Sequence, residues 1–235
     1  MDMHDLPARL HQTALRPELL PAQVHKAVTD AMHQSLAAVV VPPVWVQRVV
    51  TMLQGSGVRT HAAVGFPHGT NKSTVKAIEA TSCIKDGADG VIVVPHLPHL
   101  MRGDVDAAKH ELLEVARAAR ATRRDVAIHV IVETALVARA NPRELATHLA
   151  AACRAARESG CDGVVTDGGF LTGGTVTVER LQVLRDVAEG LTVTAAGAVE
   201  TVETALELLR AGADAVWSER AAEIAVELTQ GRVEP

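Results

Sequence analysis

The sequence is poor in aromatic residues and in clustered positive charge. Its 235 residues include no Tyr, two Phe and two Trp, so the core must be built from Ala, Val, Leu and Ile. Aromatic platforms on which nucleic-acid bases stack are therefore scarce. The net charge is −5, and the short basic run "RATRRD" (120–125) is typical of a helix surface. Both features argue against a nucleic-acid partner, because binding to a phosphate backbone needs concentrated positive charge.

Other absences limit the cellular compartment in which we expect the protein. The three cysteines, Cys83, Cys153 and Cys161, form no C-x-x-C pair, so we expect free thiols in a reducing compartment. No apolar run approaches the length of a membrane span, and "MDMHDLPARL" does not resemble a signal sequence. We therefore expect a cytoplasmic protein without a membrane partner. No G-x-G-x-x-G follows the first strand, which argues against an open dinucleotide-binding sheet.

What the sequence does contain is an alternation of short apolar runs with longer segments of helical period. The apolar runs that predict strands lie at 37–41, 60–64, 90–94, 126–132, 163–166, 191–195 and 215–218. An eighth strand is expected within 9–15. Helical periods occupy 73–85, 106–120 and 202–213. Asn141 and Pro142 in "ANPREL" predict a further helix start, and Gly87 and Gly212 predict helix ends.

This alternation predicts repeated βαβ units and a parallel sheet. Eight strands in one chain of this length favour a single-domain (β/α)8 TIM barrel over residues 1–235, with short helical segments before and between the first strands. In such a barrel the active site lies at the carboxyl ends of the strands. Because both faces of barrel strands are apolar, the pattern alone does not tell which residues point inward.

Several stretches resemble the deoxyribose-phosphate aldolase family, in order and spacing, from about residue 9 to 225. They read "HQTALRPE", "VVVPPVWV", "AAVGFPHGTNKSTVKAIEA", "DGADGVIVV", "IHVIVETALV", "GCDGVVTDGGFLTGGTVT" and "VTAAGAVETVETALELLRAGADAV". The resemblance implies a barrel of the class I aldolase type. It also implies a family activity in which an enzyme-bound Schiff base joins acetaldehyde to glyceraldehyde 3-phosphate.

The same resemblance implies that the reactive amine of the family is replaced here. The imine-forming lysine, in a pattern like V-K-T-S-T-G-F, falls on Val165, and a second lysine falls on Thr194. Where the family has an acidic residue, this sequence has Ile92, and where the family often has a cysteine, it has Val40. A Schiff base requires a primary amine, so the resemblance implies a divergent member without that chemistry.

The phosphate site that the family implies is altered as well. Three of its glycines remain: Gly169, Gly173 and Gly197. A further glycine has become Ala198, and Glu219 stands in "WSER" where a hydroxyl is expected. A carboxylate beside a phosphate dianion is repulsive. We therefore expect a substrate that is small and unphosphorylated.

Groups able to move protons remain. By resemblance, His129 stands in place of a lysine and His11 in place of an aspartate, and histidine titrates near neutral pH. We expect Glu133 to share the strand face of His129, and Asp167 to share that of Val165. Asp167 is either catalytic or a cap for the glycine-rich loop that follows it. The candidate substrate-binding residues are Thr13, Val40, Ile92, Val165, Thr166, Thr194, Gly169, Gly197, Ser218 and Glu219.

Two further groups are weighed. Lys72 and Lys76 begin a helix, and we expect them to be solvated there rather than to act as relocated nucleophiles. His68, His96 and His99 lie on neighbouring loops and invite a zinc site, but a solvated loop is favoured because the ligand spacing is weak. We expect no metal and no cofactor.

Together these inferences predict an aldolase-like lyase, cyclase or isomerase of a biosynthetic pathway. It would act by acid–base catalysis on a small carbonyl compound and form a homodimer, with Trp45 at a candidate contact. Three alternatives stay open. In the first, the chain is a non-catalytic relative that binds a metabolite or a partner. In the second, it is a metal-assisted lyase that uses the three loop histidines, and in the third, it is an aldolase whose activity another lysine restores.

Overall fold

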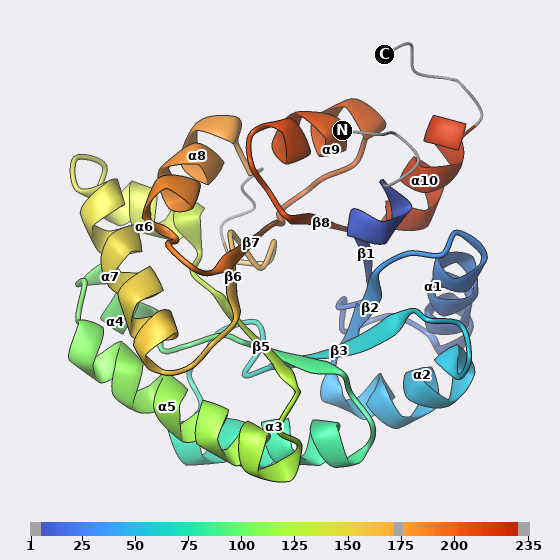
Figure 1. Cartoon of the computed structure of the whole chain (residues 1–235), viewed down its shortest axis with the longest axis horizontal. Helices are drawn as coiled ribbons and strands as arrows, with labels where there is room; N and C mark the ends of the chain where they lie inside the picture. Colours follow the sequence, from blue (N-terminus) through green and yellow to red (C-terminus); the bar gives the residue numbers. More distant parts are fainter. Residues whose placement is uncertain (1–5, 172–175, 230–235) are drawn as a thin grey trace.

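Eight parallel strands close into a barrel, and helices surround it on the outside (Figure 1). The computed structural model describes residues 6–171 and 176–229, so the predicted loop position Gly173 lies outside the described residues. Each strand pairs with the next, and β8 pairs with β1. The fold is a (β/α)8 barrel, as predicted. The strands are β1 (Leu10–Thr13), β2 (Ala38–Val41), β3 (Arg59–Val64), β4 (Gly90–Val93), β5 (Ala127–Ile131), β6 (Gly163–Val165), β7 (Thr192–Ala195) and β8 (Ala215–Ser218).

Helices follow the strands and bury their apolar sides against the barrel. They are α1 (Pro21–His33), α2 (Val46–Leu53), α3 (Ser73–Lys85), α4 (Leu97–Met101), α5 (Val105–Thr122), α6 (Thr134–Ala140), α7 (Leu145–Glu158), α8 (Val178–Val187), α9 (Val202–Arg210) and α10 (Ala221–Thr229). Short 3-10 turns precede β1 and α2, at Pro7–Arg9 and Pro43–Trp45. Among the residues that the structure describes, no helix is long and apolar enough to cross a membrane.

Most of the sequence predictions of elements are confirmed. Each predicted apolar run contains a strand, and the segment 9–15 contains β1. Gly87 and Gly212 follow helix ends with φ of +104° and +107°, a conformation that glycine adopts without steric cost. The three cysteines are free and buried.

A helix does start within "ANPREL", but at its last residue, Leu145, with Glu144 at the cap position, so the predicted roles of Asn141 and Pro142 were wrong. Asn141 lies at the carboxyl end of α6, where its backbone N–H donates to the Val137 carbonyl. Its side chain donates to the Met101 carbonyl. Helix α7 begins only at Leu145. Asparagine satisfies free backbone groups at either end of a helix, so its identity alone did not fix which end it occupies.

A layer of histidines lies inside the barrel. A barrel layer takes one side chain from each alternate strand. The odd strands contribute His11, His61 and His129, and the register places Thr194 with them. The ring centroids of His11 and His61 are 5.6 Å apart, and those of His61 and His129 are 6.1 Å apart. Side chains on alternate strands meet at such distances only in the barrel interior.

Two glycines make room for these rings. A Cβ atom on Gly90 would lie 3.0 Å from the His61 ring, and one on Gly163 would lie 3.2 Å from the His129 ring. Each glycine is the first residue of its strand and directly follows an aspartate. The side of the histidine layer toward the amino ends of the strands is therefore built from very small residues.

The next layer toward the carboxyl ends of the strands is apolar. It comes from the even strands and comprises Val40, Ile92, Val165 and Trp217. Each of these side chains is at most 3% exposed. This layer separates the histidines from the mouth of the barrel, where a substrate would enter.

Candidate active site

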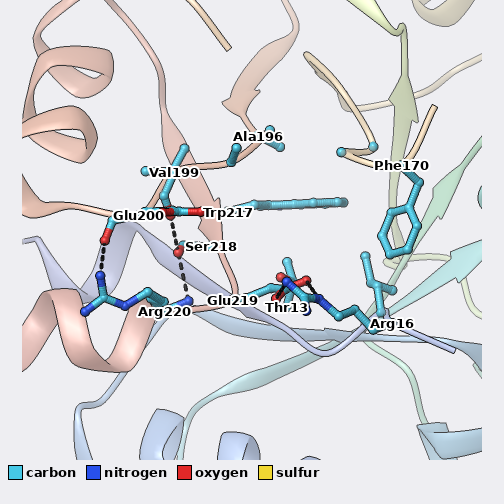
Figure 2. A pocket seen from close by; sticks show the side chains of 15 residues that line it. Thr13, Arg16, Phe170, Ala196, Val199, Glu200, Trp217, Ser218, Glu219 and Arg220 are labelled. Carbon is cyan, nitrogen blue, oxygen red and sulfur yellow. Dashed lines mark hydrogen bonds and ion pairs between the residues drawn. The ribbon is translucent and has the colours of Figure 1, made fainter. Parts of the chain in front are cut away.

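A pocket of about 330 Å³ opens at the carboxyl ends of the strands, on the side of β1, β6, β7 and β8 (Figure 2). Its lining includes five of the predicted binding residues: Thr13, Gly169, Gly197, Ser218 and Glu219. The other five predicted binding residues do not line it: Val40, Ile92, Val165, Thr166 and Thr194. Four of these five lie in the two interior layers below the pocket, so the predicted site is divided between the mouth and the interior.

An ion pair occupies one wall of the pocket. Arg16 Nη2 lies 2.8 Å from Glu219 Oε2, and Arg16 Nε donates to Glu219 Oε1 at 2.9 Å. Arg220 does not compensate Glu219, because its guanidinium turns away from it and donates to the Glu200 carbonyl and to Glu227 (Figure 2). The single bidentate pair of Arg16 and Glu219 therefore sets the charge of this wall.

Two hydroxyls that we expected to orient a substrate have other partners. Thr166 Oγ1 donates to the Ala196 carbonyl at 2.7 Å and accepts from the Ala196 N–H at 2.8 Å. Ser218 Oγ donates to the Val199 carbonyl at 2.5 Å and accepts from the Arg220 N–H at 2.8 Å. These bonds hold the loops after β6, β7 and β8 in place. Both hydroxyl groups therefore stabilise the loops that form the pocket and are not available primarily for a ligand.

Two carboxylates connect the loops after β5 and β6. Glu133 Oε1 accepts from the Gly168 N–H at 2.8 Å. Asp167 accepts from the Ala135 N–H at 2.9 Å and from Thr134 Oγ1 at 2.8 Å. Asp167 therefore caps backbone at the amino end of α6, whereas residues 172–175 of its own glycine-rich loop, where we expected a cap, lie outside the described residues. Burial raises the pKa of Asp167, and these hydrogen bonds oppose the rise.

Glu133 has the features of a reactive acid. It is not in the strand face of His129 as predicted, because it follows β5 with φ +50° and ψ +60°. This left-handed conformation is uncommon for glutamate and marks functional sites. The side chain is 1% exposed, and Oε2 has no hydrogen-bond partner. Burial raises the pKa of Glu133 to about 7, with a smaller contribution from the charge of Asp167.

Aromatic residues cluster at the same mouth, which the sequence did not predict. Phe170 and Trp217 line the pocket. The rings of Phe66 and Phe170 are 5.1 Å apart and nearly perpendicular. A Cβ atom on Gly168 would meet both Glu133 Oε1, at 2.8 Å, and the Phe66 ring, at 3.2 Å. Glu133 does not itself line the pocket but lies directly behind its rim, between the Gly168 backbone and the Phe66 ring.

The histidines lie deeper than the pocket. His11 and His129 are in the interior as predicted, but neither lines the pocket. Burial lowers the pKa of His11 to about 3, with smaller contributions from His129 and Arg59. Burial also lowers the pKa of His61 and of His129. At neutral pH the three rings are therefore uncharged.

His61 is the interior histidine that sequence reasoning missed. It is 2% exposed and neither ring nitrogen has a hydrogen-bond partner. The sequence did contain a signal for it, because a histidine within the buried strand segment "RTHAAV" is unusual. The position of its partners on β1 and β5 followed only from the register of the closed barrel.

The five lysines of the chain lie away from the pocket lining. Lys72 is exposed as expected, but the expectation for Lys76 was wrong, because Lys76 is fully buried. Its ammonium group pairs with Glu111 and donates to the Gly69 carbonyl at 2.7 Å. Glu111 in turn accepts from the His96 N–H at 2.9 Å. A buried charge is tolerated because it is paired and hydrogen bonded, and the pair ties the loop after β3 to α5.

The three loop histidines do not form a metal site. His96 and His99 have ring centroids 4.7 Å apart, at the start of and within the short helix α4, so this segment is not the open loop that we expected. His68 is exposed. Across residues 6–171 and 176–229, no group of three or more His, Cys, Asp or Glu side chains is arranged to hold a metal ion.

One loop keeps its backbone shape despite a sequence change. Ala198 has φ +51°, in the region that glycine occupies freely and other residues adopt at a cost of about 1–2 kcal/mol. The loop after β7 therefore keeps a left-handed turn at the position where a glycine was expected. The pocket rim at Gly197 and Ala198 is conformationally strained.

Comparison with curated proteins gives relatives along almost the whole chain. The chain is 36% identical over 218 residues to the deoxyribose-phosphate aldolase of Micrococcus luteus, covering 92% of this chain and 93% of that protein. It is 32% identical over 219 residues to the deoxyribose-phosphate aldolase of Thermoanaerobacter pseudethanolicus, covering 93% and 94%. No family model matches the chain.

Solved structures give the same picture. The chain is similar to the deoxyribose-phosphate aldolase of Aeropyrum pernix, described as having a unique tetrameric structure, with a TM-score of 0.87 and 25% identity over 99% of this chain and 94% of that one. It is also similar to QR15, an aldolase, with a TM-score of 0.86 and 27% identity over 97% of each chain. Both similarities extend over almost the whole chain.

Proposed function

Because the chain belongs to the deoxyribose-phosphate aldolase family, and therefore to a family of lyases, we propose that it is an aldolase-type lyase that works without an imine. The observation that carries the proposal is the pairing of a buried, partly protonated Glu133 with a barrel interior that offers no amine. Val165 and Thr194, the positions at which the family resemblance places lysines, are 0% and 2% exposed. The described pocket lining contains Arg side chains but no Lys.

Glu133 supplies the proton transfers in this proposal. In the direction of cleavage, its carboxylate takes the proton of the β-hydroxyl group, and the oxygen forms a new carbonyl as the bond between its carbon and the α-carbon breaks. The electron pair of that carbon–carbon bond passes to the carbonyl fragment as an enolate. The protonated Glu133 then returns the proton to the enolate carbon, so the carboxylate is regenerated and no other reactant is needed. A group that titrates near the working pH serves both steps.

The other catalytic candidates take supporting parts. Asp167 holds the loop of Glu133 and raises the pKa of that carboxyl group. His11 and His129 lie below the apolar layer of Val40, Ile92, Val165 and Trp217. We assign them to the neutral interior of the barrel rather than to contact with substrate. The same proton transfers serve cyclisation, isomerisation and dehydration beside a carbonyl group.

The substrate of this proposal is a carbonyl compound without a phosphate group. Glu219 brings a carboxylate to the wall where the family resemblance places a hydroxyl, and Arg16 is already engaged with it. A dianion would have to break this pair or face its carboxylate. A homodimer remains part of the proposal, supported by the exposed Val44 beside Trp45, and light scattering in solution tests it.

Reduction with borohydride tests the absence of an imine. Purified protein is incubated with acetaldehyde and borohydride, and its intact mass is measured. We expect no stoichiometric adduct on any of the five lysines. Val165→Lys serves as the positive control, because an amine restored there should be trapped. A stoichiometric adduct on the unaltered chain would remove the proposal.

Proton exchange distinguishes catalysis from mere binding. We expect the protein to exchange the α-protons of at least one of acetone, cyclohexanone and acetophenone in D2O, followed by NMR. Glu133→Gln should abolish this exchange, whereas Glu179→Gln, an exposed carboxylate on α8, should leave it unchanged. Binding of these ketones without exchange would instead favour a non-catalytic relative.

A further inference from the structure

The pocket collects most of the aromatic side chains of the chain. The sequence has two Phe, two Trp and no Tyr. Both Phe residues and one Trp lie at this mouth, since Phe66 packs on Phe170 and Phe170 and Trp217 line the pocket. In a chain with so few aromatic residues, this grouping sets the character of the site.

Phe170 is open to the cavity. It is 39% exposed, and its ring rests on Phe66 in an edge-to-face contact that orients it. The loop of Phe170 is also held by Glu133 through Gly168. An apolar ring that is fixed in place and exposed at a concave site offers a stacking surface to a ligand.

Trp217 contributes a hydrogen-bond donor rather than a stacking surface. Its side chain is 3% exposed and lies along the wall of the pocket (Figure 2). The indole Nε1 is buried and has no hydrogen-bond partner. Buried donors without a partner are uncommon and call for an explanation, such as an acceptor supplied by a ligand.

Both arginines of the described pocket lining already have partners. Arg16 is held by Glu219, and Arg220 donates to the backbone carbonyl of Glu200 and to the Glu227 carboxylate. Within the described lining, the ligand therefore meets no unpaired cation. The recognition that remains is apolar and aromatic surface together with a small number of hydrogen bonds.

We propose that this pocket binds a flat, conjugated ketone or aldehyde, whose ring system stacks on Phe170 and whose carbonyl oxygen accepts a hydrogen bond from the Trp217 indole. The inference rests on the proposed function, since it names the substrate class of the same site. The volume of about 330 Å³ lies at the small end of the range for ligand pockets. It suits a compound of one or two rings.

A matched pair of ligands tests the aromatic preference. Binding of 2-acetonaphthone and of its saturated analogue 2-acetyldecalin is measured by isothermal titration calorimetry. We expect 2-acetonaphthone to bind at one site at least tenfold more tightly. Phe170→Leu should weaken its binding about fivefold, because an aromatic contact is lost while apolar area is kept. Val44→Ala, which alters an exposed apolar residue outside the pocket lining, is the matched control and should change neither affinity.

A second pair of ligands tests the role of Trp217. In 2-isopropenylnaphthalene a carbon replaces the carbonyl oxygen of 2-acetonaphthone, so shape and ring system are kept and the acceptor is removed. We expect its affinity to be about fivefold lower. In Trp45→Phe, Trp217 is the one tryptophan left in the sequence, and saturable quenching of its fluorescence by 2-acetonaphthone reports contact with that ring.

Two results would overturn the inference. One is equal binding of 2-acetonaphthone and 2-acetyldecalin with no effect of Phe170→Leu. The other is tighter binding of glyceraldehyde 3-phosphate than of 2-acetonaphthone. Both are independent of the borohydride and exchange experiments. If 2-acetonaphthone binds as described but no exchange occurs, the ligand class stands and the proposed catalysis fails.

Discussion

Glu133 and Asp167 each hold the loop that carries the other. The Glu133 carboxylate accepts the N–H of Gly168, the residue after Asp167, and the Asp167 carboxylate accepts the N–H of Ala135, two residues after Glu133. Both side chains are 1% exposed. The difference between them is that Asp167 uses both oxygens, whereas Glu133 keeps Oε2 without a partner. The geometry therefore distinguishes two similar carboxylates, one with both oxygens hydrogen bonded and one with a single oxygen left without a partner.

Replacing Glu133 by glutamine should remove activity and leave the fold. We expect the α-proton exchange rate to fall about 100-fold, the usual scale for loss of a general base. Proton abstraction needs the carboxylate form, so the rate of the unaltered protein should rise as pH passes through about 7. The variant should lack this rise. Stability should change little, because the amide oxygen can still accept the Gly168 N–H. A variant that keeps both the rate and its pH dependence would assign the chemistry elsewhere.

Replacing Asp167 by alanine should act mainly on stability. The change leaves the Ala135 N–H and the Thr134 hydroxyl without their acceptor at the amino end of α6. Unsatisfied buried groups of this kind cost about 1–3 kcal/mol each. We expect the free energy of unfolding in urea to fall by about 2 kcal/mol. Thr177→Ala, which removes the side-chain cap of α8, provides a second cap for comparison and should cost about 1 kcal/mol. No loss of stability in Asp167→Ala would show that its bonds are weak.

The sequence was sufficient for the strands and for the order of the barrel, because apolar runs and helical periods are local signals. It was not sufficient for the contents of the interior. His11 and His129 were found, but His61 was not, since the three rings meet only through the stagger of a closed sheet. Trp217 was seen as part of a changed loop, whereas its place in the layer with Val165 depends on the register between β6, β7 and β8.

The sequence pattern also could not predict where two charged side chains lie. A lysine in the first turn of a helix, such as Lys76, is exposed in most proteins. Here its burial depends on Glu111, which lies 35 residues further along the chain. The same holds for Glu133, whose left-handed backbone turns it out of the strand periodicity that predicted its direction. In both cases a contact distant in sequence decided where the charged group lies.

The interior histidines should make the protein sensitive to acid. Burial lowers the pKa of His11 to about 3 and lowers those of His61 and His129. In the unfolded chain these side chains titrate near 6.5, so below that pH the unfolded state binds more protons. Stability is then full above pH 6.5 and falls as pH drops toward the folded values, by about 1.4 kcal/mol per pH unit for His11, and the lowered pKa values of His61 and His129 act in the same direction.

Urea unfolding between pH 7.5 and 5 measures this slope. His61→Leu should reduce it, because one of the buried titrating rings is removed. His25→Gln changes an exposed histidine on α1 and should leave the slope unchanged. Glu133 acts in the opposite direction, since its raised pKa favours folding below pH 4.5 and this gain is lost as pH rises through about 7. A stability that does not fall below pH 6.5 would contradict the buried, neutral state of the histidines.

Breaking the buried pair of Lys76 and Glu111 should be costly. Lys76→Met leaves the Glu111 carboxylate buried with the His96 N–H as a remaining donor. Removing one partner of a buried ion pair costs about 3–5 kcal/mol, and we expect a loss in that range by urea unfolding. Lys26→Met, which breaks the exposed pair with Asp30 on α1, is the matched control and should cost less than about 0.5 kcal/mol. Equal effects of the two changes would show that the buried pair contributes no more than a surface one.

The ion pair of Arg16 and Glu219 provides a test of the proposal that the pocket does not accept a phosphate group. In the unaltered protein, Nε and Nη2 of the Arg16 guanidinium are both engaged by the Glu219 carboxylate. Inorganic phosphate should therefore bind weakly. Glu219→Ser removes the carboxylate and leaves Arg16 facing the pocket, beside the rim of Gly197 and Ala198. We expect phosphate to bind at least tenfold more tightly to this variant by calorimetry, with an affinity that falls as salt increases. Glu200→Ser removes another carboxylate of the same pocket without freeing Arg16, and it should have a smaller effect. If Glu219→Ser gains nothing over Glu200→Ser, the carboxylate at position 219 is not what keeps phosphate out, and the strained backbone at Ala198 becomes the group to change next.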